Sequence, residues 1–407
     1  MRLKLLSLLI ALGILSLSAA GKYQYDNYYY QRATLFEVLP VDSADIVMLG
    51  NSITNGGDWH EIFNLPNIKN RGIISDIIQG MYDRVDPYIA GHPKKLFLLG
   101  GVNDISHHLS ADSIASAIGK LCDYIMAKSP STKLYLQSVF PFNNSFKRYR
   151  NLIGTEQVQI DLNRILVEMA AKKGITYIDV VPALVDEEGN LRREFTADGL
   201  HLNTSGYKAW AEVLAPHIGL VSEPLYSINP GDIVIVGGSL VSGCEWFELL
   251  ENSKVKKRTN GDNCATLPAL VEQVAKAKPA QIVITAEYSG LKGDINEADI
   301  LASVRKSLDA VRTYSPDSKV VLVGLSPINS TYKGYEAFAG KEKQTREINA
   351  KLKKLAGKYG VAWIDLFPQL AKKNQLAPIY TNDGYHLMGV GYLKWRNLLF
   401  KYISPEI

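Results

Sequence analysis

Four polar residues that together could cleave an ester are spread over the first half of the sequence. Ser52 and Asn103 each follow a short apolar run, whereas Asp198 and His201 stand three residues apart near residue 200. A serine can attack a carbonyl, a histidine can take its proton, and an aspartate can hold the imidazole in the required tautomer. An asparagine amide can donate a hydrogen bond to the developing oxyanion. Each residue alone is ordinary turn chemistry, so the hypothesis requires a fold that brings the four together.

The apolar runs predict strands of a parallel sheet, because they are short, partly β-branched and suited to burial on both faces. Helical periodicity separates them. Ile114, Ile118, Leu121 and Ile125 would share one helix face, with Ser110 as the N-cap. This alternation predicts a doubly wound α/β/α sandwich, in which ligands bind beyond the carboxyl ends of the strands. The predicted strands are Asp45–Leu49, Leu96–Leu99, Leu134–Val139, Thr176–Asp179, Ile233–Val236, Gln281–Thr285, Val320–Gly324 and Ala362–Asp365.

The pattern occurs twice. The segment Gly50–Gly56 recurs as Gly237–Gly243, and Asp198–Leu202 recurs as Asp383–Leu387. The offset drifts only from 187 to 185 residues, which small loop deletions explain. Ordered matches of this kind predict a tandem duplication, with two copies of one fold joined by a short linker.

The first twenty residues are typical of a secretory signal peptide. Arg2 and Lys4 precede the apolar run Leu5–Leu17, and the small residues at 18–20 suit cleavage. The run is shorter than the roughly 18–20 residues that a membrane-spanning helix needs. We therefore expect an exported protein, periplasmic or extracellular, without stable membrane insertion. The predicted units are a signal peptide over 1–20, a first domain over 21–222 and a second domain over 223–407.

Composition excludes several classes of protein. Among 407 residues, 46% are hydrophobic and 21% are charged, which is ordinary for a globular chain. The net charge of +4 is too even to predict a nucleic-acid partner. Three cysteines exclude a disulfide-dense scaffold and every CxxC zinc pattern. Cys244 and Cys264 lie in loops expected at one rim of the sheet, so a disulfide between them is one expectation and two buried thiols the other.

The ordered motifs of the first copy resemble those of the SGNH (GDSL-type) hydrolase superfamily, nearest to secreted bacterial acetylesterases and the platelet-activating-factor acetylhydrolase-like branch. The resemblance implies a flavodoxin-like parallel sheet and a reaction that needs no metal or cofactor. Ser52 would be the nucleophile, His201 the base and Asp198 its partner. Ser52, Gly72 and Asn103 would form the oxyanion hole. The motifs are Gly50-Asn51-Ser52-Ile53-Thr54, Asn70-Arg71-Gly72, Gly101-Val102-Asn103-Asp104 and Asp198-Gly199-Leu200-His201.

Two positions of the first copy depart from the family pattern. Asn51 stands where an aspartate usually precedes the nucleophile, and Ile74-Ser75 follows Gly72 where a second glycine is frequent. The first position is not catalytic in the family. The second departure is expected to narrow the mouth of the pocket.

The second copy keeps Ser239, Asp383 and His386 at the positions of the nucleophile, its aspartate and its base. Its third block is lost, because Glu287 and Tyr288 lie where the asparagine block should be. Two interpretations stay open. The second copy is either an impaired hydrolase kept as a structural or glycan-binding partner, or a second active site with other oxyanion donors.

The resemblance implies hydrolysis of short acyl esters, with acetyl groups on carbohydrate, such as O-acetylated sialic acid or a polysaccharide, as the expected substrates. The enzymatic alternative is a lipase, thioesterase or phospholipid acetylhydrolase of the same fold. The alternative from another class is a non-catalytic carbohydrate-binding protein with two domains. The expected partner is a small-molecule or glycan ester, and the oligomeric state stays open. The basic run Lys254–Arg258 is expected to be a solvated strand edge.

Overall fold

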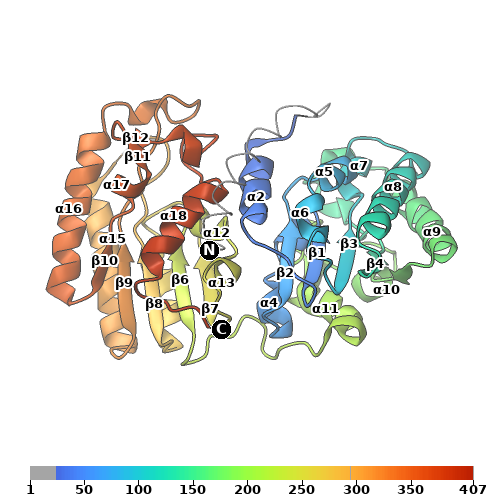
Figure 1. Cartoon of the computed structure of the whole chain (residues 1–407), viewed down its shortest axis with the longest axis horizontal. Helices are drawn as coiled ribbons and strands as arrows, with labels where there is room; N and C mark the ends of the chain where they lie inside the picture. The colour runs from blue at the N-terminus through green and yellow to red at the C-terminus, as the bar shows by residue number, and fades with distance from the viewer. Residues whose placement is uncertain (1–23, 294, 407) are drawn as a thin grey trace.

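The computed structural model describes residues 24–293 and 295–406, so the predicted signal peptide lies outside the described residues. The described chain forms two five-stranded parallel sheets with the strand orders β2-β1-β3-β4-β5 and β7-β6-β8-β9-β10. The predicted fold class is confirmed as two tandem α/β domains of the same topology (Figure 1). The strands are β1 (Ile46–Gly50), β2 (Ile68–Gly72), β3 (Lys95–Leu99), β4 (Lys133–Gln137), β5 (Thr176–Ile178), β6 (Ile233–Gly237), β7 (Val255–Thr259), β8 (Gln281–Thr285), β9 (Lys319–Val323) and β10 (Ala362–Ile364).

Helices flank both sheets, and a small hairpin of β11 (Ala371–Lys372) and β12 (Gln375–Leu376) completes the second domain. The predicted amphipathic helix is α8, which begins after Ser110, whose hydroxyl caps the Ser113 N–H. The helices of the first domain are α2 (Asn27–Glu37), α3 (Ser52–Asn55), α4 (Trp59–Phe63), α5 (Ile78–Asp83), α6 (Asp86–Ile89), α7 (Val102–Ser106), α8 (Ala111–Lys128), α9 (Glu156–Lys173), α10 (Val181–Leu184) and α11 (Thr204–Ile218). Those of the second are α12 (Ser239–Ser242), α13 (Trp246–Leu249), α14 (Leu267–Lys276), α15 (Glu297–Tyr314), α16 (Glu342–Tyr359), α17 (Phe367–Leu370) and α18 (Gly389–Leu399).

The two domains meet on the side of their charged edge strands, β2 and β7, which the apolar patterns do not predict. Arg71 on β2 donates two hydrogen bonds to Glu248 of the second domain, at 3.0 and 2.8 Å. Arg258 on β7 donates two to Glu61 of the first domain, both at 2.9 Å. Arg258 follows Arg71 by 187 positions, and Glu248 follows Glu61 by 187 positions, so the two pairs are reciprocal, as in an isologous dimer. The expectation of a solvated edge at Lys254–Arg258 is therefore wrong for Arg258, and also for Lys257, whose ammonium group lies 3.4 Å from both Asp58 and Glu245.

His60 and Phe247, also 187 residues apart, stack at this seam with ring centroids 3.8 Å apart. The imidazole is buried, and its Nε2 atom has no hydrogen-bond partner among the described residues. Burial lowers the pKa of His60 to about 4, although Asp58 and Glu245 nearby act to raise it. The seam therefore holds a neutral ring stacked on an aromatic ring.

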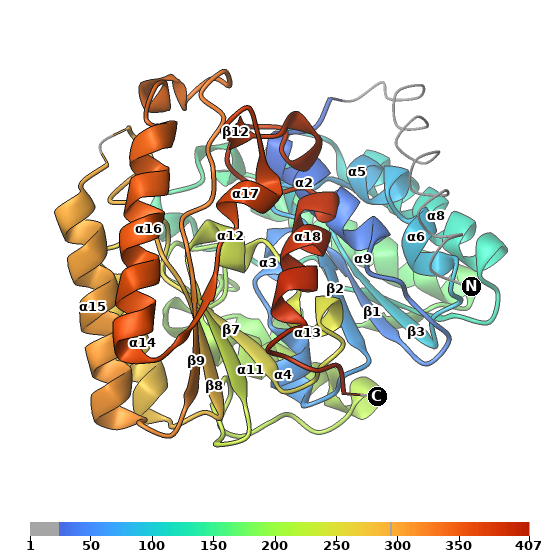
Figure 2. The ribbon, with the colours of Figure 1, turned by 60° about the vertical axis from the view of Figure 1, so that its left-hand side comes forward.

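Helix α2 lies between the two domains, as the views in Figures 1 and 2 show. Arg32 on this helix donates to Glu245 at 2.5 Å, and both side chains are buried. Gln31 donates to Asp383 at 3.0 Å, and the Thr34 hydroxyl accepts the Gly389 N–H of α18 at 3.1 Å. The N-terminal helix thus packs on the second domain as well as on the first.

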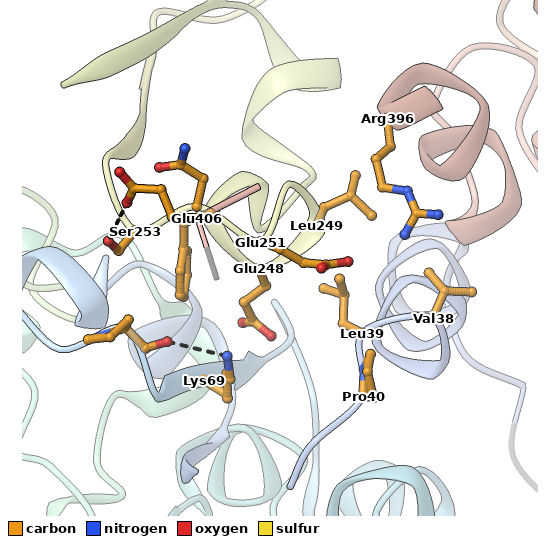
Figure 3. Close-up of a pocket in the computed structure, with 13 residues that line it drawn as sticks. Val38, Leu39, Pro40, Lys69, Glu248, Leu249, Glu251, Ser253, Arg396 and Glu406 are labelled. Atoms are coloured by element: carbon orange, nitrogen blue, oxygen red, sulfur yellow. Dashed lines mark hydrogen bonds between the residues drawn. The ribbon is translucent and has the colours of Figure 1, made fainter. Parts of the chain in front are cut away.

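A groove of about 520 Å³ lies at the same seam, lined by residues of both domains (Figure 3). Its wall carries charges of both signs, including Lys69, Glu248 and Arg396. Glu248 is engaged by Arg71, and Lys69 lies 3.7 Å from Asp45. We therefore interpret the groove as part of the domain interface.

The expected Cys244–Cys264 disulfide is wrong, because both cysteines are free and buried. They face different neighbours. The Cys244 carbonyl accepts from Lys257 at the domain seam, whereas the Cys264 carbonyl accepts from Ser303 on α15. Within residues 24–293 and 295–406, no helix has the length and apolar character needed to cross a bilayer.

Replacing Glu248 with alanine should lower the free energy of unfolding by about 3–5 kcal/mol, because it leaves Arg71 buried without its counter-ion. Glu347→Ala is the matched control, since Glu347 and its partner Lys343 are exposed, and it should cost less than about 1 kcal/mol. Urea unfolding of both variants measures the difference. Equal losses would contradict the buried ion pair.

Replacing His60 with phenylalanine should remove part of the acid sensitivity of folding. The unfolded chain protonates this histidine below its ordinary pKa of 6.5, whereas the folded chain does so only near pH 4. The stabilisation is therefore complete above about pH 6.5 and declines as the pH falls towards 4, by about 3 kcal/mol in all. Urea unfolding at pH 7.5 and 4.5 should show a smaller decline for His60→Phe than for the wild type. A parallel decline would contradict the prediction.

Candidate active site

Ser52 lies just beyond the carboxyl end of β1, a fully buried central strand. The Asn51 side chain accepts the Ile53 N–H at 3.0 Å and so caps the short helix α3, in which Ser52 is the first residue. A Cβ on Gly50 would lie 2.1 Å from Thr54 Oγ1 and 2.7 Å from the Leu99 carbonyl. Only glycine therefore allows the tight turn that presents Ser52 at the rim of the sheet.

A tight turn holds Asp198 and His201 together, and it too depends on side-chain-to-backbone hydrogen bonds and on a glycine. The Thr196 hydroxyl accepts the Gly199 N–H at 2.9 Å, and Asp198 Oδ1 accepts the His201 N–H at 2.8 Å. Gly199 has a φ of +90°, and a Cβ there would lie 2.4 Å from the Asn143 carbonyl. A glycine is thus required between the two functional side chains.

The structure brings the three predicted residues Ser52, His201 and Asp198 into one hydrogen-bonded chain. His201 Nε2 lies 2.9 Å from Ser52 Oγ, and its Nδ1 lies 2.8 Å from Asp198 Oδ2. This arrangement can carry a proton from a serine to an imidazole whose other nitrogen is held by a carboxylate.

Tyr149 is a further member of this chain that the sequence analysis missed. Its hydroxyl donates to Asp198 Oδ2 at 2.7 Å and lies 3.0 Å from His201 Nδ1. Partial burial acts to raise the pKa of Asp198, but hydrogen bonds from His201, two backbone N–H groups and Tyr149 outweigh it and hold this pKa well below its usual value. Asp198 is therefore ionised at neutral pH, and it can orient His201.

The oxyanion donors differ in part from those expected. The Gly72 N–H donates to Asn70 Oδ1 at 2.9 Å, so the expectation that it serves the oxyanion is wrong. Gly72 is needed for another reason, because a Cβ there would lie 2.2 Å from the Asn55 nitrogen. Ser75 lines the pocket instead, and it adopts a left-handed conformation with φ +62°. The Ser75 N–H has no hydrogen-bond partner among the described residues.

Asn103 is placed at the pocket by the short helix α7, which follows Gly101 with its φ of +123°. Its amide nitrogen donates to the Asp76 carbonyl at 2.8 Å. An amide has two N–H donors, so this bond fixes the side chain and leaves the second donor for a ligand. Asn103, Ser52 and Ser75 all line one pocket of about 460 Å³.

The second domain keeps the same hydrogen-bonded chain. Ser239 Oγ lies 2.8 Å from His386 Nε2, and His386 Nδ1 lies 2.7 Å from Asp383 Oδ2. Burial acts to raise the pKa of Asp383, but its hydrogen bonds prevail and lower it to about 2. The geometry of the three side chains therefore does not distinguish the two domains.

The surroundings of Ser239 do distinguish them. Asp262 Oδ1 accepts both the Ser239 N–H and the Ser239 hydroxyl, each at 2.7 Å. Glu287 accepts the Gly238 N–H at 2.7 Å, and burial raises the pKa of Glu287 to about 8. A carboxylate thus occupies the donor that an oxyanion would need, and it competes with His386 for the only proton of the hydroxyl.

The sequence analysis anticipated Glu287 near this site but missed Asp262. The sequence did hold a sign of it. The glycine that should correspond to Gly72 is displaced to Gly261 in the second copy, and Asp262 follows it directly. The sequence also showed that Ile74-Ser75 follows Gly72 where a second glycine was expected. Ser75 has a left-handed φ of +62°, a conformation that glycine adopts without strain, which gives a physical reason for the glycine expected after Gly72.

The comparisons with known proteins match part of this chain. Residues 48–209 match the GDSL-like lipase/acylhydrolase family. A curated relative, N-acylneuraminate cytidylyltransferase of Escherichia coli O18:K1:H7 (strain RS218 / NMEC), is 30% identical over 168 residues. That match covers 40% of this chain, and the chain spans only about two fifths of the relative (38%).

Two solved structures are also similar. A Streptococcus pneumonia protein provisionally described as a platelet activating factor is 26% identical, with 47% of this chain and 91% of that chain covered and a TM-score of 0.43. A GDSL-like lipase from Bacteroides thetaiotaomicron is 23% identical, with 47% and 96% covered and a TM-score of 0.42. The family match over residues 48–209 includes Ser52, Asn103 and His201. The first domain is therefore similar to the GDSL-like lipase/acylhydrolase family over residues 48–209, which supports the resemblance to the SGNH superfamily that its motifs indicate.

Proposed function

We propose that this protein is an exported serine esterase that removes short acyl groups, above all acetyl, from esters of carbohydrate such as O-acetylated sialic acid or a polysaccharide. The observation that carries the proposal is the 2.9 Å contact between Ser52 Oγ and His201 Nε2. Asp198 lies behind the imidazole at 2.8 Å and favours the tautomer that can accept a proton.

In the proposed reaction, Ser52 Oγ attacks the ester carbonyl carbon while His201 Nε2 takes the hydroxyl proton. The N–H groups of Ser52 and Ser75 and the amide of Asn103 would hold the oxyanion of the tetrahedral intermediate. When the intermediate collapses, His201 returns the proton to the leaving alcohol, and an acyl group stays on Ser52. Water, activated by the same imidazole, then releases the acid and restores the serine.

The pocket supports a small polar substrate. It holds about 460 Å³, and most of the residues that line it carry polar groups, with Ser106, Arg148 and Asn151 among them. The relative from Escherichia coli is named for N-acylneuraminate, a sialic acid, which supports this class of sugar for the acetyl ester.

We propose that the second domain arose by duplication and is an impaired hydrolase kept as a structural or glycan-binding partner. The hydrogen bonds from Ser239 to Asp262 support this interpretation. The carboxyl oxygens of Asp262 are acceptors and offer an oxyanion at that position no hydrogen-bond donor. The basic and apolar residues at 1–20 support export to the periplasm or the extracellular space.

Ser52→Ala should remove acetyl-ester hydrolysis, whereas Ser239→Ala should leave at least about half of it, because only Ser52 has free oxyanion donors. The measurement is acetate release from p-nitrophenyl acetate and from an O-acetylated sialic acid. A fluorophosphonate should label the wild type and Ser239→Ala but not Ser52→Ala. Full activity in Ser52→Ala would overturn the proposed site. Absence of labelling in the wild type would favour a carbohydrate-binding protein.

Asn103→Ala should lower kcat by about 10²–10³-fold, because it removes one oxyanion donor. KM should change much less, since the donor acts mainly on the charge of the transition state. Steady-state kinetics on p-nitrophenyl acetate test this, with circular dichroism to verify folding. A folded variant that loses less than threefold in kcat would contradict the role of Asn103.

A further inference from the structure

Two arginines stand over the pocket of Ser52 without a counter-ion. Arg148 and Arg150 line this pocket on either side of Tyr149, in the connection between β4 and α9. The lining contains no aspartate or glutamate. Within the described chain, neither guanidinium takes part in an ion pair or donates a hydrogen bond. The nearest functional carboxylate, Asp198, is already engaged by His201 and Tyr149.

Four arginines with largely buried side chains are paired. Arg32, Arg71, Arg84 and Arg258 each form an ion pair with a buried carboxylate. Two unpaired guanidinium groups beside a polar cavity are suited to an anionic ligand, because a guanidinium binds a carboxylate through two parallel N–H donors.

The second domain provides an internal comparison at the same place in the fold. Here the offset is 186 residues, so Tyr149 corresponds to Tyr335, whereas Arg148 and Arg150 correspond to Gly334 and Glu336. The 3₁₀ turn is the same in both copies, over Arg150–Leu152 and Glu336–Phe338.

One hydrogen bond that holds the connection between β4 and α9 in place has an equivalent in the second domain. Asn143 donates to the Leu191 carbonyl at 2.8 Å, and Asn329 donates to the Leu376 carbonyl at 2.8 Å. The fold of the connection therefore does not need the arginines. They are present only in the copy whose serine is free of a competing carboxylate.

We propose that Arg148 and Arg150 bind a carboxylate of the substrate, so that this esterase selects acyl esters of acidic sugars over those of neutral sugars. The inference rests on the proposed function and adds a requirement for negative charge on the alcohol part of the ester. The carboxylate would lie at the mouth of the pocket while the ester carbonyl lies at Ser52. An acidic sugar of the N-acylneuraminate type meets both conditions.

The test compares an O-acetylated N-acylneuraminate with the same compound carrying a carboxamide in place of its carboxylate. The wild type should have at least about tenfold higher kcat/KM for the acid. Arg148→Gln and Arg150→Gln should each reduce this preference several-fold, and the double variant should abolish it, mainly through KM. Rising salt should weaken the preference in the wild type, because the charges are exposed.

Arg164→Gln is the matched control, because Arg164 is an exposed arginine on α9 whose partner is Asp161 on the same helix. It removes one positive charge from the same domain, and it should keep the preference of the wild type. A wild type that hydrolyses both compounds equally through Ser52 would overturn the inference while leaving the proposed esterase standing. A preference that survives in the double variant would overturn it as well.

Binding separates the two proposals if neither sugar is hydrolysed. Calorimetric titration of N-acylneuraminate into Ser52→Ala protein, with and without both arginine substitutions, reads the carboxylate site without any reaction. Binding that is lost on removing the arginines would support the carboxylate site although the esterase proposal had failed. Absence of arginine-dependent binding would overturn the site.

Discussion

The hydroxyl proton of the nucleophile is the constraint on which the two sites depend. A serine has one proton to donate, and at Ser52 the described neighbour able to take it is His201 Nε2, at 2.9 Å. At Ser239 two acceptors compete, His386 Nε2 at 2.8 Å and Asp262 Oδ1 at 2.7 Å. If the proton goes to Asp262, the imidazole can only donate to the serine, and a donor cannot act as a base. One carboxylate is thus enough to separate two sites whose other distances agree within about 0.1 Å.

The interface between the domains is also built from equivalent parts of the two copies of the fold. Each sheet ends in a charged edge strand, and an exposed edge is a hazard because its backbone groups can pair with other chains. Here the edges face each other, and Arg71 and Arg258 each reach a glutamate of the opposite domain. Breaking either pair would leave a buried charge. The two domains are therefore held together by reciprocal contacts that neither could complete alone.

The sequence predicted the central strands and the main functional residues for clear physical reasons. Strands buried on both faces must be apolar, so β1 and β3 were visible, whereas β2 and β7 carry charges that are neutralised only across the seam. Ser52, Asp198 and His201 were visible because their types and order are distinctive. The role given to Gly72 failed because a residue type does not reveal which way its N–H points. That depends on Asn70, whose side chain takes the Gly72 N–H, and on the left-handed turn at Ser75.

The second domain also contacts the segment of the first domain that leads to the pocket of Ser52. Glu248 of the second domain binds Arg71, and Arg71 directly precedes Gly72 at the end of β2, where the chain turns towards Ser75. Phe36 and Tyr88 of the first domain cover the same guanidinium, with ring centroids 4.9 and 5.7 Å from its central carbon. The segment that leads to Ser75 at the pocket is therefore anchored by an ion pair to the other domain. Selection for activity at Ser52 would then preserve the fold of the second domain even after its own serine had been engaged by Asp262.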